Sequence, residues 1–173
     1  MSGKRQFFIE GQELASEPHH YTACGLDDVY LLNGFTMEKT DYGPGISIDN
    51  VDGLHRAIAL HLVLHRKALS PKEFRFLRKQ MNLTQKELAT SLGVSDQSVA
   101  RYEKAETEIA GPSDRLVRFY YALSIIPEDL RAGVLEALNT FIHDVDQDEV
   151  NVPPAYFSVS ESGWTETSAS MRS

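Results

Sequence analysis

The sequence predicts a mainly α-helical fold with a small β-hairpin unit on its N-terminal side. Two capping boxes, Ser70 to Glu73 and Thr84 to Glu87, mark the starts of short helices, because in each box the side chains satisfy exposed backbone N–H groups. The Asn33-Gly34 pair favours a two-residue hairpin turn, because both residue types tolerate a positive φ. With 173 residues, 42% of them hydrophobic, the chain has enough apolar material for a packed core.

The N-terminal part of the chain divides into a polar lead-in and the hairpin unit. Residues 1–20 show no hydrophobic period, and we expect them to be flexible. Within residues 21–65, the β-prone run Val29 to Leu32 is expected to pair with Phe35 to Thr40 across the Asn33-Gly34 turn. The unit is therefore predicted to contain one β-hairpin.

A helix over residues 53–65 is predicted to follow the hairpin. Either Asn50 or Asp52 is suited to cap its N-terminus. Its apolar residues recur at helical spacing on one face: Leu54, Ile58 and Leu62. This helix leads into the segment in which the helix signals are strongest.

Residues 66–125 are predicted to hold four short helices. Pro71 follows the cap Ser70 at the first helical position, where its missing N–H is not needed. A second helix begins after Thr84 and ends at Gly93, a position suited to the left-handed conformation.

The third helix, Asp96 to Lys104, follows the cap Ser95, and Gly111-Pro112-Ser113 opens the fourth. A fifth helix within residues 126–145 completes a five-helix domain. Its apolar face is a candidate dimer interface: Leu130, Val134, Leu138 and Phe141. Packing of this face on the fourth helix, or a dimer through residues 21–65, are the alternatives.

The C-terminal residues 146–173 are acidic and rich in Ser and Thr, and we expect them to be disordered. Their aromatic residues, Tyr156, Phe157 and Trp164, leave open that the segment orders on a protein partner.

Charge is distributed unevenly. Residues 65–121 contain 11 Lys and Arg against 7 Asp and Glu, a balance of +4, whereas the rest of the chain carries −12. A basic segment within an acidic chain is typical of a nucleic-acid contact.

Two short capped helices separated by Gly93-Val94-Ser95, next to basic residues, predict a helix-turn-helix. In this motif the second helix packs steeply on the first, which favours a small residue such as Ala89 at the crossing. The second helix of the motif, predicted over Asp96 to Lys104, would then present its N-terminal polar residues to a DNA major groove.

The run LTQKELATSLGVSDQSVARYEKAE, Leu83 to Glu106, resembles the Xre/Cro-type repressors, and the resemblance covers about residues 70–123. It implies that four residues face DNA bases: Asp96, Gln97, Ala100 and Arg101. Val99 and Tyr102 are expected in the core. Arginine pairs well with guanine and glutamine with adenine, which suits Arg101 and Gln97. Asp96 has the alternative role of stabilising the helix N-terminus.

Other residues are expected to contact DNA phosphates and to supply affinity that does not depend on sequence. The resemblance implies this role for Gln85. Lysine and arginine side chains add Lys86, Lys104, and either Arg78 or Lys79.

A second resemblance covers the N-terminal side. Tyr21-Thr22-Ala23-Cys24-Gly25, followed by a hairpin and a helix-turn-helix, is similar to the MqsA-type antitoxins, which join a zinc-binding unit to a DNA-binding domain. The first cysteine of their C-x-x-C-G motif is Tyr21 here, and with one cysteine a four-thiolate zinc site is impossible. The resemblance implies a degenerate, zinc-less unit.

We expect no cofactor, no metal and no enzymatic activity. A mixed metal site of Cys24 with His55, His61 and His65 is the alternative, but surface or amphipathic histidines explain the pattern more simply. Cys24 lies near Asp27 and Asp28, whose charges disfavour a reactive thiolate.

The sequence thus predicts a homodimeric, autoregulatory transcriptional repressor that binds a double-stranded DNA operator. The alternative is an antitoxin that neutralises a toxin by protein contact, and a small-molecule sensor in residues 21–65 is a third hypothesis. The single cysteine and the absence of a long apolar run favour a cytoplasmic protein without membrane contact.

Overall fold

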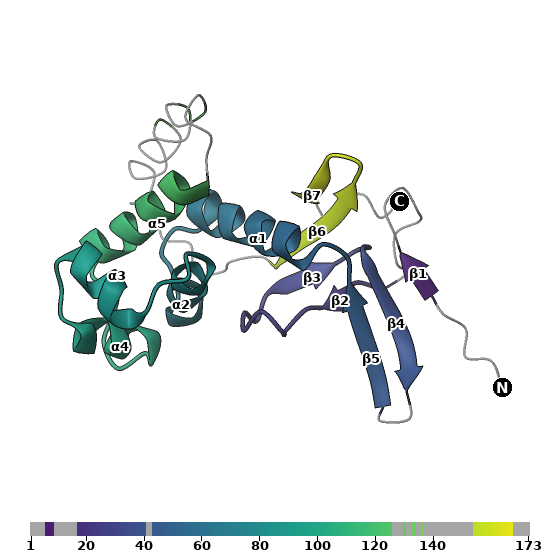
Figure 1. Cartoon of the computed structure of the whole chain (residues 1–173), viewed down its shortest axis with the longest axis horizontal. Coiled ribbons are helices and arrows are strands. Elements are labelled where there is room, and N and C mark those ends of the chain that lie inside the picture. The colour runs from purple at the N-terminus through teal and green to yellow at the C-terminus, as the bar shows by residue number, and fades with distance from the viewer. Residues whose placement is uncertain are drawn as a thin grey trace. The chain divides into compact units, whose positions relative to one another are not determined.

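The computed structural model divides the chain into two units (Figure 1). The β unit comprises residues Met1–Ile58 and Pro153–Ser173, and the helical unit comprises Ala59–Val152. The structure describes residues 6–8, 17–40, 43–125, 130, 133, 136 and 154–167. The β unit is therefore assembled from two separate stretches of sequence, and the helical unit is inserted between them.

The β unit contains two sheets. The three-stranded sheet has the order β1-β4-β5 and is antiparallel throughout, with β1 (Gln6–Phe8), β4 (Phe35–Thr40) and β5 (Gly43–Ile48). The four-stranded sheet has the order β2-β3-β6-β7, with β2 (His19–His20), β3 (Val29–Leu31), β6 (Ala155–Ser160) and β7 (Gly163–Glu166). In this sheet β3 and β6 pair in parallel, and the other neighbours are antiparallel.

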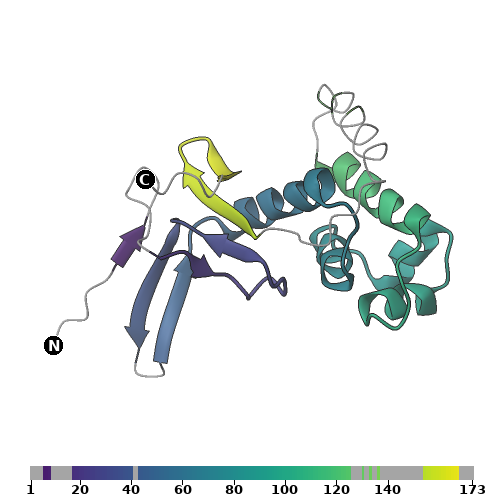
Figure 2. The same cartoon turned by 180° about the vertical axis from the view of Figure 1, so that it is seen from behind.

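The prediction of a hairpin across Asn33-Gly34 is wrong. β3 and β4 belong to different sheets, and β4 pairs instead with β5 as the two-stranded arm seen in Figure 2. The buried Asn33 amide donates to the Val159 carbonyl (3.3 Å), and its oxygen accepts from the Val159 N–H (2.8 Å). Gly34 has the expected positive φ of 73°, but the pair forms a corner between two sheets rather than a hairpin turn.

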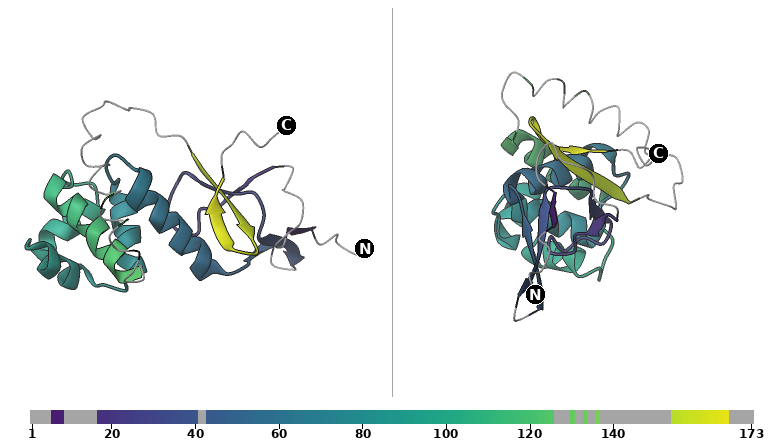
Figure 3. Two further views of the ribbon diagram at one scale, coloured as in Figure 1. Left: turned by 90° about the horizontal axis from the view of Figure 1, so that it is seen from above. Right: turned by 90° about the vertical axis from the view of Figure 1, so that its right-hand side faces the viewer.

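The C-terminal segment differs from expectation in its described part. Residues 155–166, expected to be disordered, form the β6–β7 hairpin, drawn in yellow in Figure 3. Phe157 is fully buried and Trp164 is 8% exposed, with its indole N–H donating to the Asp49 carbonyl at 3.1 Å. These aromatic side chains therefore fold into the chain's own β unit, because β3 offers β6 a strand edge and a core to cover.

Helix α1 (Val51–His65) begins at one of its two predicted caps. The Asn50 side-chain oxygen accepts from the Gly53 N–H at 3.0 Å, so Asn50 is the cap. Leu54 and Ile58 are buried in the part of the helix that belongs to the β unit, and Leu62 and Val63 are buried in the part that belongs to the helical unit.

The helical unit continues with four helices, in agreement with the mainly α fold that was predicted: α2 (Pro71–Gln80), α3 (Gln85–Leu92), α4 (Asp96–Glu103) and α5 (Gly111–Ile125). α5 packs against α2 and α3. Its buried Arg118 donates from Nη1 to the Leu62 and Arg66 carbonyls at 2.9 and 2.7 Å, and so satisfies the C-terminal end of α1. Asp114 holds the same guanidinium at 2.6 Å.

The expected fifth helix of this domain, residues 126–145, falls almost entirely outside the described residues. Of its candidate interface, Leu130 is described and is 59% exposed, while Val134, Leu138 and Phe141 lie outside the described part. Among the helices that the structure describes, none is long and apolar enough to cross a membrane.

Candidate nucleic-acid interface

Helices α3 and α4 form a compact pair joined by a tight turn. Both expected features of α3 are confirmed: Thr84 and Glu87 form a capping box, with the Thr84 N–H donating to the Glu87 carboxylate at 2.7 Å, and Gly93 ends the helix at φ 68°. The Ser95 hydroxyl accepts from the Ser98 N–H at 3.0 Å and starts α4. These local signals fix both ends of the turn.

The inner side of α4 packs against the rest of the helical unit. Val99 is fully buried and Tyr102 is 9% exposed, as expected, and the Tyr102 ring meets Phe74 of α2 edge-on with ring centres 5.8 Å apart. Ala89 of α3 is buried, which suits the small residue predicted at the crossing of α3 and α4. This packing leaves the opposite side of α4 facing outward.

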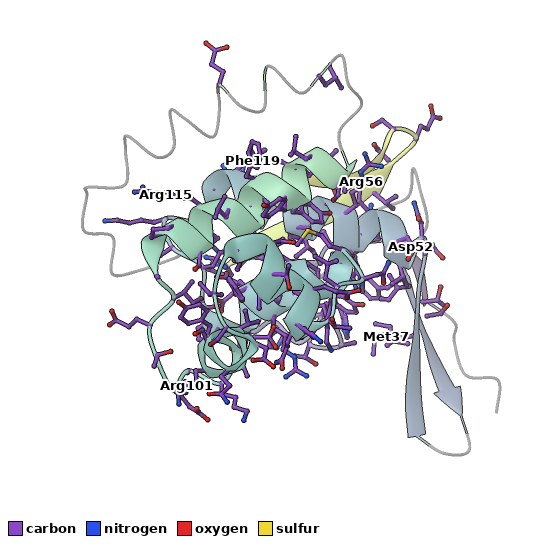
Figure 4. All side chains as sticks on the ribbon, turned by 60° about the vertical axis from the view of Figure 1, so that its left-hand side comes forward. Met37, Asp52, Arg56, Arg101, Arg115 and Phe119 are labelled. Carbon is purple, nitrogen blue, oxygen red and sulfur yellow. The ribbon has the colours of Figure 1, made fainter. Side chains whose placement is uncertain are left out.

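The outward side of α4 presents the four residues that were expected to face bases. Asp96, Gln97 and Arg101 are exposed and Ala100 is half-buried. Arg101 lies at the rim of the helical unit and points away from it (Figure 4). Asp96 also accepts the Gln97 N–H at 2.9 Å, which fits its alternative role at the helix N-terminus.

A shallow depression of about 390 Å³ lies where the N-termini of α3 and α4 come together. It is lined by Thr84, Gln85, Lys86, Asp96, Gln97 and Ala100. Side chains of Thr84, Ser95 and Asp96 cap several first-turn N–H groups, but the positive end of each helix dipole remains. Two such helix ends beside Lys86 favour an anion such as a DNA phosphate. Residues expected to contact bases and phosphates thus share one surface.

The candidate phosphate contacts divide into two groups. Lys79, Lys86 and Lys104 are exposed, and Lys104 has Glu106 at 3.9 Å. Arg78 differs: its side chain is 11% exposed, and its Nη1 donates to the Leu83 carbonyl at 2.7 Å. Of the two alternatives, Arg78 and Lys79, only Lys79 keeps an exposed cation for DNA.

Arg78 is held by Glu103, whose importance the sequence analysis missed. The guanidinium donates to both Glu103 oxygens, at 2.5 Å from Nε and 2.9 Å from Nη2, and the Glu103 side chain is 3% exposed. Gln85, expected to contact phosphate, donates its side-chain amide to the same carboxylate at 2.9 Å. The three residues link α2, the start of α3 and the end of α4.

The ion pair also determines how Glu103 titrates. Burial alone raises the pKa of Glu103, but hydrogen bonds from Arg78 and Gln85 and the charges of Arg78 and Arg75 outweigh it, so the net pKa is below its usual value. Glu103 is therefore a charged positioning residue for α4. A signal for it was present in the sequence as the Arg-Tyr-Glu-Lys run, but its partner on α2 is distant along the chain.

Cys24 and the histidines that were considered for metal binding or thiol chemistry make hydrogen bonds and ring contacts within the protein. Cys24 donates its thiol to the Tyr21 carbonyl at 3.4 Å, and the Tyr21 hydroxyl is hydrogen-bonded to His55 Nε2 at 3.0 Å. Burial raises the pKa of the Cys24 thiol, and Asp27 adds to this, although backbone hydrogen bonds act in the opposite direction. A thiol with a raised pKa is a weak nucleophile at neutral pH. His61 and His65 lie with their ring centres 5.3 Å apart on α1.

Comparison with known families supports the presence of a helix-turn-helix. Residues 74–112, from within α2 to the start of α5, match the family model described as helix-turn-helix. The match supports the Xre-like helix-turn-helix expected for this segment, and models of this family describe DNA-binding regulators. Searches with the chain gave no significant match to a curated protein or to a solved structure.

Proposed function

We propose that the protein is a sequence-specific transcriptional repressor that binds an operator, including one at its own gene. One observation carries the proposal: the exposed side of α4 presents Gln97 and Arg101 next to a depression formed by two helix N-termini. A major groove admits one α-helix, and occupation of an operator prevents transcription without any enzymatic step.

Each side chain has a distinct task in this proposal. The Arg101 guanidinium donates two parallel hydrogen bonds to a guanine, and the Gln97 amide pairs with an adenine. Lys86 and the helix N-termini at the depression bind a phosphate and set the register of α4 on the duplex. Glu103 and Arg78 contact no DNA but keep α4 at the correct angle.

We further propose that the protein binds its operator as a two-fold homodimer, because two half-sites one helical turn apart lengthen the sequence that is read. Leu130, which follows α5 in the chain, supports a contact in this region, since it is a large apolar side chain left 59% exposed. Leu130→Asp is expected to shift the chain toward monomer in sedimentation equilibrium. An unchanged mass would place the dimer contact elsewhere.

A gel-shift titration with DNA from upstream of the gene tests the operator proposal. Arg101→Ala should lower specific affinity by about 1–3 kcal/mol and relax the preference at one base pair. Lys86→Ala should weaken all sequences equally and reduce the salt dependence by about one counterion. Arg115→Ala is the matched control, because Arg115 is an exposed cation of α5 lying away from Arg101 (Figure 4). An equal loss of specific affinity in the Arg115 and Arg101 variants would contradict the assignment of α4 as the helix that reads the DNA bases.

A second candidate function is that of an antitoxin of the MqsA type with a degenerate zinc-less unit. It is favoured by Tyr21, which stands at the position of the missing zinc ligand, is 5% exposed and bonds to His55. These contacts are of the kind that would replace a metal in stabilising the unit. Co-purification with the product of a short adjoining gene, retained in Arg101→Ala, is the expected result. If the chain does not co-purify with that product, the antitoxin proposal is wrong and the repressor proposal is the one that remains.

A further inference from the structure

Two histidines lie one helical turn apart at the C-terminal end of α1. His61 and His65 are four positions apart, so their side chains share one face of the helix. Their ring centres are 5.3 Å apart, and one nitrogen of each ring lies within 4.8 Å of one nitrogen of the other. His61 is half-buried and His65 is exposed, so a small ion can reach them from solvent. We call these two residues the histidine pair.

The histidine pair differs from the mixed metal site that was considered from the sequence. That site required Cys24 and His55 as further ligands, but the Cys24 thiol donates to the Tyr21 carbonyl, and His55 is hydrogen-bonded to the Tyr21 hydroxyl. Cys24 and His55 belong to the β unit, whereas the histidine pair belongs to the helical unit. Tyr21 and Cys24 are also the positions that match the zinc motif of the MqsA-type antitoxins, so the histidine pair does not restore that centre.

The charges at this end of α1 are compensated within the helical unit. Arg66, the residue after the helix, is buried and forms an ion pair with Glu73. Arg118, which donates to the last carbonyls of α1, is held by Asp114. Because each arginine is paired with a carboxylate, their charges do not exclude a bound cation beside them.

Imidazoles at this spacing are ligands for transition-metal ions. Imidazole nitrogen suits Zn²⁺, Cu²⁺ and Ni²⁺, whereas Mg²⁺ and Ca²⁺ prefer oxygen ligands. In the H-E-x-x-H pattern, two histidines four positions apart bind zinc from one face of a helix, and the glutamate between them acts as a general base. The corresponding run His61-Leu62-Val63-Leu64-His65 keeps both ligands and has Leu62 in place of the glutamate. The pair therefore has the ligands for a metal ion but lacks the base for hydrolysis.

We propose that the histidine pair binds a divalent transition-metal ion and that the bound ion stabilises the helical unit. The helix backbone holds both histidines on one face before binding, so little conformational freedom is lost. Rotation of the two rings brings one nitrogen of each to about 2.0–2.1 Å from a Zn²⁺ ion, and water completes its coordination. An ion that binds the folded helix and not the unfolded chain raises the stability of the fold.

Isothermal titration calorimetry of the full-length chain with Zn²⁺, in the absence of a histidine tag, tests the proposal. His61→Ala and His65→Ala each remove one ligand, and alanine has the highest helix propensity, so α1 should still form. His65 is exposed, so its replacement leaves the core intact. His20→Ala, which removes an exposed histidine of the β unit, is the matched control. Far-UV circular dichroism without metal checks that each variant is folded.

We expect wild type to bind Zn²⁺ at one site, Cu²⁺ to bind there more tightly, and Mg²⁺ and Ca²⁺ not to bind. Replacing a residue that only orients a metal ligand lowers affinity by about 10–100-fold, so the loss of a ligand should weaken Zn²⁺ binding by at least about tenfold in either variant. His20→Ala should bind like wild type. Saturating Zn²⁺ should raise the Tm of wild type and of His20→Ala, and raise it less in His61→Ala and His65→Ala.

Three outcomes would overturn the proposal. In the first, Zn²⁺ binds wild type no more tightly than Mg²⁺ does. In the second, folded His65→Ala binds Zn²⁺ with the affinity of wild type. In the third, saturating Zn²⁺ leaves the Tm of wild type unchanged. Metal-free His65→Ala should bind operator DNA like wild type, because α3 and α4 are untouched, so failure of the repressor proposal is read separately from failure of this one.

Discussion

Replacing Arg78 by methionine tests the inference that a buried ion pair holds α4 in place. Methionine preserves most of the volume and the helix propensity of the side chain but removes all its donors. The Glu103 carboxylate, 3% exposed, then keeps the Gln85 hydrogen bond and the Arg75 guanidinium, whose Nε lies 4.0 Å away. The Leu83 carbonyl loses its 2.7 Å partner.

The magnitude follows from these contacts. Leaving one member of a buried pair without its partner costs about 3–5 kcal/mol. The Gln85 bond and the charge of the exposed Arg75 offset part of this, so we expect a loss of about 3 kcal/mol in the free energy of unfolding. Glu103→Gln removes the charge and keeps an acceptor oxygen, so it should cost less. In the double variant the two losses should not add, because both residues belong to one interaction.

Urea unfolding followed by far-UV circular dichroism measures these losses. Because its hydrogen bonds hold the pKa of Glu103 below its usual value, this carboxylate adds stability at neutral pH that is lost as the pH falls through its folded-state pKa. Glu103→Gln should therefore unfold with a weaker dependence on acidic pH than wild type. A loss below about 1 kcal/mol in Arg78→Met, typical of a surface pair, would refute the reasoning.

Three further changes have expected results. Arg118→Met removes the donors to the carbonyls at the end of α1 and should lower the free energy of unfolding by about 3 kcal/mol, measured with urea. Gly34→Ala places a Cβ 2.5 Å from the Trp164 ring at a positive φ, so it should cost about 2 kcal/mol or more and lower the midpoint of the Trp164 emission transition. Gly93→Ala meets no neighbour within 4 Å, so backbone strain alone should cost about 1 kcal/mol in thermal unfolding; an unchanged Tm would contradict the left-handed assignment.

Local signals made the helical unit predictable. The capping boxes at Ser70 and Thr84 and the stop at Gly93 depend on residues within four positions of each other, and each lies in the structure where it was expected. The burial of Val99 and Tyr102 was expected from their positions on the inward side of the helix that begins after Ser95. Such features are determined by nearby sequence and survive in any packing of the unit.

Long-range pairing made the β unit hard to predict. Asn33-Gly34 has the local chemistry of a hairpin turn, but its surroundings come from β6 and β7, more than a hundred residues later in the chain. Phe157 and Trp164 occur in a polar background that resembles a disordered tail, and only the edge of β3 gives them a core to join. The pairing of Arg78 with Glu103 was missed for the same reason, since charge pairs between helices leave no periodic signal.

The most direct test of the central claim is a map of backbone amide chemical shifts in the labelled chain as an operator duplex is added. We predict that the largest changes fall at Thr84 to Lys86 and at Asp96 to Arg101, with small changes in the β unit. The same titration with Arg101→Ala should need more DNA to reach saturation. Changes concentrated on the strands of the β unit, with α4 unaffected, would contradict the account.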